Sequence, residues 1–278
     1  MTDTEQIGVI GVGRMGQAMT KHLIRHGHKV IANDIEPKAC EAARGLGAGI
    51  LGTPAEVGKV CSFVIIAVGY DNEAAAVMLD RDGLLQTMAP DSTIAVSSTC
   101  TPDHVKQLAE KAREKNIEVL DAPICRGQRA ADDGTMLTLC GGRAVIFERA
   151  KPIYATFCKD IVLLGDVGAG QVGKTMNNFL LWVNGIALIE AGRLSECYGM
   201  DLVKLREALL MSSGASDALK NWENVSFLWA LKDMQIVMQM ADKSGLSLPM
   251  AGAVKELVKE GRRTKQTNPP AWTGRKSR

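Results

Sequence analysis

The sequence lacks the patterns that mark membrane-spanning, disulfide-bonded and zinc-binding chains. None of its apolar runs approaches the ~20 residues that a transmembrane helix needs. Its seven cysteines stand singly, without a CxxC pair, and its four histidines complete no metal-ligand spacing with them. We therefore expect reduced thiols, no disulfide framework and no metal site.

An excess of charge of one sign is also missing, because the formal net charge is only +2. Such a balance gives no reason to expect nucleic acid or an anionic membrane as a partner. The basic and then apolar pattern of a signal peptide is absent as well, since IGVIGVG is short and rich in glycine. These absences predict a soluble, cytoplasmic protein.

The first half of the chain alternates short β-branched runs with amphipathic stretches. The runs predict buried parallel strands at residues 6–12, 28–34, 61–68, 91–98 and 117–123. The stretches predict helices at residues 15–27, 36–47 and 102–116, each ending in glycine or asparagine. Repeated alternation of this kind is typical of an α/β fold with a doubly wound, Rossmann-type parallel sheet. A shorter strand pair is expected at residues 135–142 and 160–166.

The pattern changes near Gly165, and the second half is predicted to be all helical. Helical periodicity without proline marks residues 171–198, and it continues in residues 201–213, 228–245 and 249–261. We expect an α/β domain over residues 1–166, a helical domain over residues 167–262, and a loosely held basic tail over residues 263–278.

A glycine-rich turn, GVGRMG, follows the first predicted strand. Gly11, Gly13 and Gly16 fit the GxGxxG spacing, a helix opens inside the turn, and the next strand ends in Asn33 and Asp34. Gly11 permits the tight turn, Gly13 lets a pyrophosphate approach the backbone, and Gly16 lets helix and strand pack closely. The phosphates of a dinucleotide would then meet the unpaired N–H groups of the helix N-terminus. The context predicts a dinucleotide site and makes glycines that serve only as turns the weaker alternative.

Asp34 indicates which dinucleotide is bound. Its carboxylate suits the ribose hydroxyls of adenosine and would repel the extra phosphate of NADP, and Ile35 follows it instead of an arginine. We therefore expect NAD. Asn33, together with Arg14 and Met15 at the start of the helix, completes the cofactor contacts expected here. Because Arg14 could reach a phosphate, NADP stays open as an alternative.

Two further segments follow predicted strands, at the edge where such sheets bind their ligands. We expect Val68, in AVGYDNEA, to pack beneath the cofactor. We expect Ser98 or Thr99, in SSTCTP, to hydrogen-bond the nicotinamide ribose or carboxamide. For the serines, capping of the helix that starts at Pro102 is an alternative at least as well supported by the residues alone.

The segment GAGQVGKTMNN places Lys174 and Asn178 four residues apart, on one face of a helix. That helix is otherwise rich in apolar residues, namely Val172, Met176, Phe179, Leu180 and Val183. A lysine among them would be partly removed from water, which favours the neutral amine that proton transfer needs. The alternative, favoured by composition alone, is a lysine whose stem covers apolar surface while its charge stays in water.

Taken in order, GVGRMGQAM, SST, DAP with a following glycine, GAGQVGKTMNN and KD resemble the β-hydroxyacid dehydrogenase family. This family includes 3-hydroxyisobutyrate dehydrogenase and tartronate semialdehyde reductase, and the resemblance covers roughly residues 5–250. It implies an NAD-binding Rossmann-type domain joined by one long helix to an all-helical domain for substrate binding and dimerisation. It also implies a homodimer or homotetramer, and an oxidoreductase that acts on the CH–OH group of a short hydroxy acid or reduces the matching semialdehyde.

Carried over by position, the resemblance makes Lys174 the general acid/base and Asn178 its neighbour in contact with substrate, with Asn177 as the alternative asparagine. It places Thr99 beside the nicotinamide. Protonated Lys174 would donate to the carbonyl oxygen of an aldehyde, and the neutral amine would take the proton of an alcohol. General acid–base help of this kind contributes roughly 10²–10⁴-fold to a rate.

Lys232 and Asp233, in LKDMQ, fall on a further predicted helix. Most Lys–Asp dipeptides belong to a solvated surface, and periodicity does not distinguish this one. The resemblance implies instead that Lys232 lies near cofactor and substrate, with Asp233 supporting it.

The stretch LDAPICRGQ departs from the family pattern. After DAP and one apolar residue the family has a serine and two glycines that hold the substrate carboxylate, whereas here Cys125, Arg126 and Gly127 follow. A related branch, the sulfolactaldehyde reductases, is similar in having an arginine here that engages the substrate sulfonate. Because a guanidinium is a rigid fork of donors suited to oxyanions, we expect Arg126 to bind the acidic group of the substrate. The alternative is an Arg126 that turns outward or pairs with Asp132 or Asp133.

Two other functions stay open at this point. One is a non-catalytic, cofactor-binding scaffold on the same fold, and the other is an imine reductase of the same architecture. Retention of Lys174 with Asn178 argues against both, because imine reductases typically lack a lysine at this position. The expected partner is a small acidic aldehyde or alcohol, and the residues do not name which one.

Overall fold

The computed structural model describes residues 6–274 of the chain. The chain forms two compact units, residues 1–174 and residues 175–278. One long helix, α8 (Ala169–Cys197), begins in the N-terminal unit and continues into the C-terminal unit. The division between the units therefore falls inside this helix, because its first residues pack with the sheet.

The N-terminal unit is built on a nine-stranded sheet. Six of its strands are parallel and follow the order β3-β2-β1-β4-β5-β6, which is the strand order of a Rossmann fold. β8 continues the sheet antiparallel to β6, and it also pairs with β7 and, in parallel, with β9. The strands are β1 (Ile7–Ile10), β2 (Val30–Asn33), β3 (Gly49–Ile50), β4 (Phe63–Ile66), β5 (Thr93–Val96), β6 (Glu118–Asp121), β7 (Ile124–Cys125), β8 (Met136–Gly141) and β9 (Cys158–Gly165).

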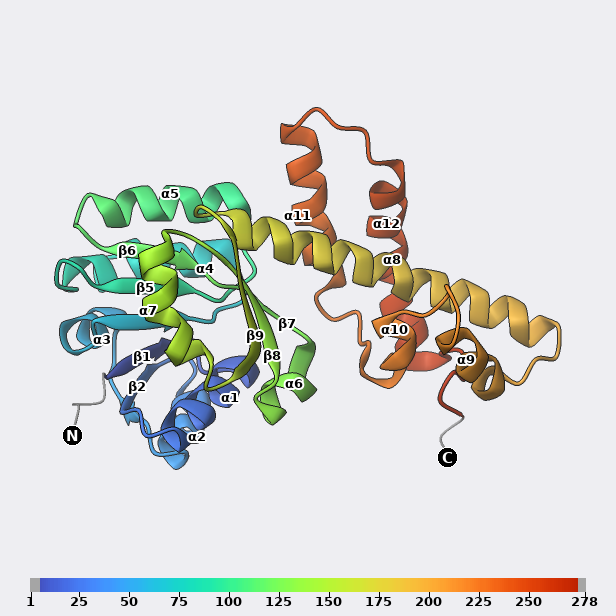
Figure 1. Cartoon of the computed structure of the whole chain (residues 1–278), viewed down its shortest axis with the longest axis horizontal. Coiled ribbons are helices and arrows are strands. Elements are labelled where there is room, and N and C mark those ends of the chain that lie inside the picture. The colour runs from blue at the N-terminus through green and yellow to red at the C-terminus, as the bar shows by residue number, and fades with distance from the viewer. Residues whose placement is uncertain (1–5, 275–278) are drawn as a thin grey trace. The chain divides into compact units, whose positions relative to one another are not determined.

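Helices cover both faces of this sheet, which is why its central strands are apolar throughout. On one face α1, α2 and α7 pack into a core that includes Met19 and Phe147 (Figure 1). On the other face α3, α4 and α5 pack into a second core that includes Met78 and Leu108. The helices are α1 (Arg14–Arg25), α2 (Pro37–Gly45), α3 (Pro54–Val60), α4 (Asp71–Leu79), α5 (Pro102–Arg113), α6 (Gly127–Asp133) and α7 (Ala144–Tyr154), with a 3₁₀ turn at Leu84–Gln86.

The predicted fold class is confirmed, and so are the individual strands of the first half. The five strands predicted in the first half correspond to β1, β2, β4, β5 and β6. The shorter pair predicted after them corresponds to β8 and β9. Helices α1, α2 and α5 also follow the prediction, whereas periodicity did not predict α3, α4, α6 and α7. A local signal for α3 was available, because Pro54 opens it and Thr53 and Glu56 form a capping box.

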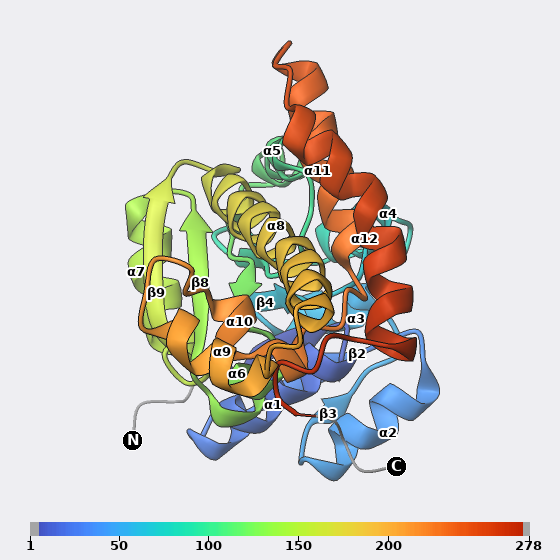
Figure 2. The same cartoon turned by 90° about the vertical axis from the view of Figure 1, so that its right-hand side faces the viewer.

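Every regular element that the structure describes in the C-terminal unit is a helix, as predicted. Its core gathers large side chains from several helices, among them Trp182, Trp222 and Phe227. Helices α11 and α12 pack side by side (Figure 2). Within residues 6–274, no helix is long and apolar enough to cross a membrane. After α8 the helices are α9 (Leu202–Leu210), α10 (Asp217–Lys220), α11 (Ala230–Lys243) and α12 (Pro249–Thr267), with a 3₁₀ turn at Trp222–Asn224.

The expectation of a loosely held tail from residue 263 is wrong for most of that segment. Helix α12 continues to Thr267, and the Trp272 side chain is completely buried, with its indole N–H donating to the carbonyl of Leu188 at 2.9 Å. A satisfied, buried indole stabilises the segment against the charges and prolines that suggested a loose end. Residues 275–278 of the predicted tail lie outside the described part of the chain.

Candidate cofactor and active site

The glycine turn after β1 is shaped by three different constraints. Gly11 has a φ of +86°, and a Cβ there would lie 2.6 Å from the carbonyl oxygen of Ala67. A Cβ on Gly16 would lie 2.0 Å from the carbonyl oxygen of Gly11, so only glycine lets α1 approach the turn. A Cβ on Gly13 would meet nothing within 4 Å. The turn is therefore closed behind Gly11 and Gly16 and open at Gly13, which is the shape that a pyrophosphate requires.

The start of α1 offers donors to an anion at this open side. Gly13 is the N-cap of α1 and supplies no side-chain cap, so the first N–H groups of the helix have no cap within the described chain. Arg14 is exposed at the first helical position, and Met15 is half-buried against the core beneath it. These residues fit a dinucleotide, since uncapped N–H groups and the helix dipole both favour phosphate.

Asp34 lies just after β2 and holds the glycine turn from the side. Its carboxylate accepts from the backbone N–H of Val12 at 2.7 Å and from that of Glu36 at 2.9 Å. A carboxylate has about four lone-pair positions, so acceptor capacity is left for ribose hydroxyls. Ile35 is 90% exposed and carries no charge that could hold a 2′-phosphate. Asn33 is buried and donates to the carbonyl of Leu51 at 2.9 Å, which directs its amide toward β3.

The loop after β5 is tied to the loop after β4. The hydroxyl of Ser98 accepts from the backbone N–H of Val68 at 2.8 Å, and Ser98 is 4% exposed. Thr99, the next residue, is partly exposed. The alternative that the serines cap α5 is wrong, because the N-cap of that helix is Thr101 and it makes no side-chain capping bond.

A buried carboxylate at the end of β6 holds the start of α8. Asp121 is completely buried and accepts from the backbone N–H groups of Gly168 and Gln171, each at 2.8 Å. Burial raises the pKa of Asp121 to about 6, while the N–H groups that it accepts from oppose the rise. In the sequence, Asp121 was noted only as part of the DAP motif. The glycines of GDVGAG, between β9 and α8, did indicate a helix start, whose first N–H groups need an acceptor.

Lys174 and Asn178 lie on the same face of α8, as their spacing predicts. Lys174 is partly buried, Asn178 is 6% exposed and Asn177 is exposed. The apolar neighbours expected to shield the lysine are themselves partly in solvent, since Val172 is 39% exposed and Met176 is 38% exposed. The surroundings of Lys174 are therefore less apolar than the composition of the helix suggested.

In the C-terminal unit, Asn178 belongs to a buried polar cluster. Asp233 on α11 accepts from the Asn178 amide at 2.8 Å and from the Trp182 indole at 2.9 Å. The side-chain amide of Asn177 donates to the side-chain amide oxygen of Asn178 at 3.0 Å, which fixes the orientation of the Asn178 amide. Asp233 is 4% exposed, so it does not belong to the solvated surface that is usual for Lys–Asp dipeptides. Lys232 is partly exposed, with its ammonium 5.9 Å from the centre of the Trp229 ring.

Arg126 adopts a backbone conformation that normally belongs to glycine. Its φ is +80°, and that of Gly127 is +69°, so the turn keeps the shape of a Gly–Gly pair. One guanidinium nitrogen donates to Asp160 on β9 at 2.6 Å and to the carbonyl of Thr135 at 3.1 Å. The alternative expectation, a pair with Asp132 or Asp133, is wrong, because the carboxylate that pairs with Arg126 is Asp160. Both contacts use the same Nη, so Nε and the second Nη of Arg126 keep N–H groups to donate.

The thiol of Cys125 faces the interior. Cys125 is 3% exposed, and its thiol lies near that of Cys158. Burial, followed by the neighbouring thiols of Cys140 and Cys125, raises the pKa of Cys158 well above its ordinary value. Burial likewise raises the pKa of Cys140 to about 11. The thiols of Cys140 and Cys158 stay protonated at neutral pH. Cys125, being buried, offers substrate no exposed side chain.

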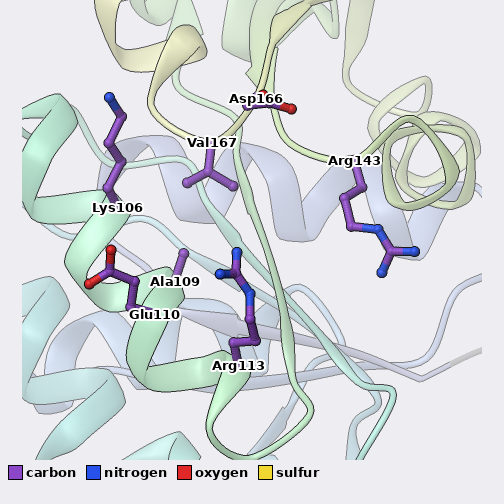
Figure 3. Close-up of a pocket in the computed structure, with 7 residues that line it drawn as sticks. All are labelled: Lys106, Ala109, Glu110, Arg113, Arg143, Asp166 and Val167. Atoms are coloured by element: carbon purple, nitrogen blue, oxygen red, sulfur yellow. The ribbon is translucent and has the colours of Figure 1, made fainter.

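The N-terminal unit also has a surface cavity of about 410 Å³ beside α5. Lys106, Glu110 and Arg113 come from α5, Arg143 precedes α7, and Asp166 precedes α8 (Figure 3). Every one of these five side chains is exposed, and charges of both signs line the cavity. No residue predicted to bind cofactor or substrate belongs to it.

Two family models match the chain and between them span both units. One, described as the NAD binding domain of 6-phosphogluconate dehydrogenase, matches residues 6–165. The other, described as NAD-binding of NADP-dependent 3-hydroxyisobutyrate dehydrogenase, matches residues 168–269. The chain belongs to the β-hydroxyacid dehydrogenase family. The family predicted from the motifs is thereby confirmed.

Characterised members of the β-hydroxyacid dehydrogenase family resemble the chain over most of its length. The 2-hydroxy-3-oxopropionate reductase of Escherichia coli (strain K12) is 31% identical over 262 residues, which cover 91% of this chain and 89% of that protein. An NAD-dependent L-serine dehydrogenase of Pseudomonas aeruginosa is 30% identical over 272 residues, 92% of this chain and 91% of that protein. This β-hydroxyacid dehydrogenase is accordingly an NAD(P)-dependent oxidoreductase.

A solved structure supports the same assignment at the level of the fold. Mycobacterium tuberculosis 3-hydroxyisobutyrate dehydrogenase, determined with L-serine, matches with a TM-score of 0.85 at 23% identity. The match covers 92% of this chain and 93% of that one. At this level of identity the likeness shows a shared fold and nothing finer.

Proposed function

We propose that this β-hydroxyacid dehydrogenase transfers hydride between NAD(H) and a short hydroxy acid or its semialdehyde, with Lys174 as general acid/base. The observation that carries the proposal is the place of Lys174 on α8. The first turn of that helix is hydrogen-bonded to the loop around Thr99, at the edge of the sheet where Rossmann folds bind their cofactor. The names of the family members that the chain resembles support hydroxy acids and semialdehydes as the substrate class.

The chain's own residues have distinct tasks in this reaction. Gly11, Gly13 and Gly16 leave room for a pyrophosphate at the start of α1, and Asp34 offers acceptors to the adenosine ribose. NAD(H), when bound, supplies or accepts the hydride. The ammonium of Lys174 donates a proton to the carbonyl oxygen of the semialdehyde, and in the reverse direction its amine takes the proton of the hydroxyl.

The preference for NAD over NADP rests on Asp34 and Ile35. A carboxylate beside the adenosine ribose would repel a 2′-phosphate, and the exposed Ile35 offers no compensating cation. Arg14, the candidate for such a cation, is the first residue of α1 and does not follow β2 as Asp34 and Ile35 do. We therefore infer a lower KM for NADH than for NADPH.

Replacing Lys174 by alanine tests the assignment. We expect Lys174→Ala to lose about 10²–10⁴-fold in kcat, because it removes the only proton donor proposed for the carbonyl oxygen. NADH absorbance with a panel of short semialdehydes measures turnover, and a fluorescence titration measures NADH affinity, which we expect to stay as in the wild type. The control is Lys111→Ala, an exposed lysine on α5 that pairs with Glu114.

Two outcomes of that experiment contradict the proposal. Turnover near wild type in Lys174→Ala would remove the lysine from the chemistry. A wild-type chain that binds NADH but does not oxidise it with any semialdehyde of the panel would favour the non-catalytic scaffold.

The remaining donors of Arg126 also fit a second candidate substrate class, aldehydes whose acidic group is a sulfonate. Its side chain is 42% exposed and one nitrogen is held by Asp160, so Nε and the second Nη are left to bind an oxyanion. Either a carboxylate or a sulfonate fits such a fork. The arginine therefore bears on which acidic aldehyde is preferred, and Lys174 keeps its task in both cases.

The variant Arg126→Gly tests whether Arg126 binds the acidic group of the substrate. Glycine adopts a φ of +80° without strain, which offsets the loss of an exposed ion pair worth at most about 1 kcal/mol. We therefore expect a melting temperature close to that of the wild type. If Arg126 binds the acidic group, KM rises for carboxylate- or sulfonate-bearing aldehydes and stays the same for an uncharged aldehyde of equal length. Equal losses for charged and uncharged aldehydes would show that Arg126 does not contact the acidic group.

Association into a homodimer or homotetramer also belongs to this proposal. Large apolar side chains remain exposed on the C-terminal unit, with Leu194 62%, Tyr198 81% and Met211 83% exposed. We expect part of this apolar surface to be covered by a second copy of the chain. Light scattering coupled to size-exclusion chromatography would measure the mass, and a monomer at micromolar concentration would contradict the expectation.

A further inference from the structure

Gln171, in the first turn of α8, binds the backbone on both sides of Thr99. Its side chain is completely buried. The amide oxygen accepts from the N–H of Cys100 at 3.0 Å, and the amide nitrogen donates to the carbonyl of Ser98 at 2.9 Å. One side chain thus fixes the residues before and after Thr99.

The turn that carries Gln171 is itself held rigidly. The backbone N–H of Gln171 donates to the carboxylate of Asp121, which also accepts from Gly168. A Cβ on Gly170 would lie 2.4 Å from the carbonyl oxygen of Leu139 and 2.7 Å from the carboxylate of Asp121. The helix start is therefore in direct contact with β6 and β8 and has no room to shift toward them.

Lys174 lies three residues after Gln171 on the same helix. At a rise of ~1.5 Å per residue, its Cα is about 4.5 Å further along the axis. Because a helix is rigid over one turn, a displacement of Gln171 moves Lys174 with it. The two hydrogen bonds of the amide thus connect the lysine to the loop of Thr99 through one helical turn.

We infer that Gln171 is a positioning residue, which sets the place of Lys174 relative to the Thr99 loop while Asp121 fixes the turn that carries both. This inference rests on the proposed function, in which Lys174 exchanges the proton and Thr99 lies beside the nicotinamide. The side chain of Gln171 is completely buried, so it presents no surface to a bound substrate or cofactor. Its effect is on geometry, where a misplacement of about 1 Å can lower a rate by ~10²-fold.

The first test replaces Gln171 by methionine, which has a similar size, no donor for Ser98 and only a weakly accepting sulfur for Cys100. We expect kcat to fall by ten- to a hundredfold in Gln171→Met, with NADH affinity and substrate KM close to wild type. The stability control is Thr156→Val, which removes another buried hydrogen bond, 2.7 Å to the carbonyl of Ile153, away from α8. A kcat that falls only as far as the folded fraction falls, in both variants alike, would show a merely structural role.

The second test is a conservative variant whose rescue depends on pH. In Gln171→Glu a protonated carboxyl can still accept from Cys100 and donate to the carbonyl of Ser98, whereas the ionised form has no proton to donate. We expect activity relative to wild type to be highest at the lowest pH and to fall as the new carboxyl ionises. The wild type, measured at the same pH values, removes the contribution of the other groups that face this turn, which are Asp121 on β6, Cys140 on β8, and Lys106 on α5 beside Gly168.

The outcomes separate this inference from the proposed function. If Lys174→Ala is inactive while Gln171→Met turns over like the wild type, the positioning role is wrong and the lysine assignment stands. If Lys174→Ala is active, the proposed function fails first. If Gln171→Met does not fold, the pH profile of Gln171→Glu decides, and a profile parallel to that of the wild type would overturn the inference.

Discussion

At the scale of single residues, the position of a side chain in the fold changes what its identity suggested. Asp121 served in the sequence only as part of the DAP motif, yet its completely buried carboxylate holds the start of α8. Arg126 was expected to bind an anion, yet Asp160 already holds one of its nitrogens. In both cases a partner distant in sequence decides the role.

Asp121 gives a pH dependence of stability whose sign follows from its pKa. Burial raises the pKa of Asp121 from 3.8 to about 6, so the folded chain binds this proton more tightly than the unfolded chain. The stabilisation is therefore present below about pH 4 and is lost as pH rises to about 6, an effect on the order of 3 kcal/mol. In Asp121→Asn this titration is absent.

The measurement compares urea unfolding of wild type and Asp121→Asn at several pH values between 4 and 7. We expect the free energy of unfolding of the variant, relative to wild type, to increase across this range. A difference that stays constant with pH would mean that the Asp121 carboxyl titrates alike in both states, contrary to its burial.

At the scale of elements, the turn between β1 and α1 offers a matched pair of glycines. A Cβ on Gly13 meets no atom within 4 Å, whereas a Cβ on Gly16 would lie 2.0 Å from a carbonyl oxygen. We expect Gly13→Ala to keep the melting temperature and weaken NADH binding, because the methyl group occupies the space left for the pyrophosphate. We expect Gly16→Ala to lower the melting temperature, because α1 must move away from the turn.

Thermal unfolding and an NADH fluorescence titration on both variants check this pair. Unchanged NADH affinity in Gly13→Ala would mean that the phosphates do not approach the turn at this glycine. An unchanged melting temperature in Gly16→Ala would mean that the contact with the Gly11 carbonyl relaxes at little cost.

Elements were predictable where the local pattern was strong. Fully buried strands such as β4 and β5 appear as continuous β-branched runs, and α8 has helical periodicity without proline. Helices α3 and α6 were not predicted because each has only seven residues, too few to show a clear helical period. Helix α7 was not predicted because Pro152 interrupts the helical pattern within its last turn.

At the scale of the whole molecule, the stability of the C-terminal unit depends on a residue that composition assigned to a loose tail. Trp272 is completely buried among the helices of that unit and donates to Leu188. We expect Trp272→Ala to destabilise the unit by about 3–5 kcal/mol. The control is Tyr198→Ala, since that aromatic side chain is 81% exposed. Thermal unfolding checks the pair, and equal melting temperatures for the two variants would contradict the burial of Trp272.

The sequence by itself determined the Rossmann-type sheet, the helical second half, the glycine turn with Asp34, and the pairing of Lys174 with Asn178 on one helix face. These features depend on local periodicity, on turn chemistry and on spacing along one element, and residues close together in the sequence determine all three. Only the tertiary structure decided that Asp121 and Gln171 fix the start of α8, that Asp233 is buried beside Asn178, and that Asp160 holds Arg126. Those contacts join residues from separate elements, and no local pattern encodes which buried polar group will meet which partner.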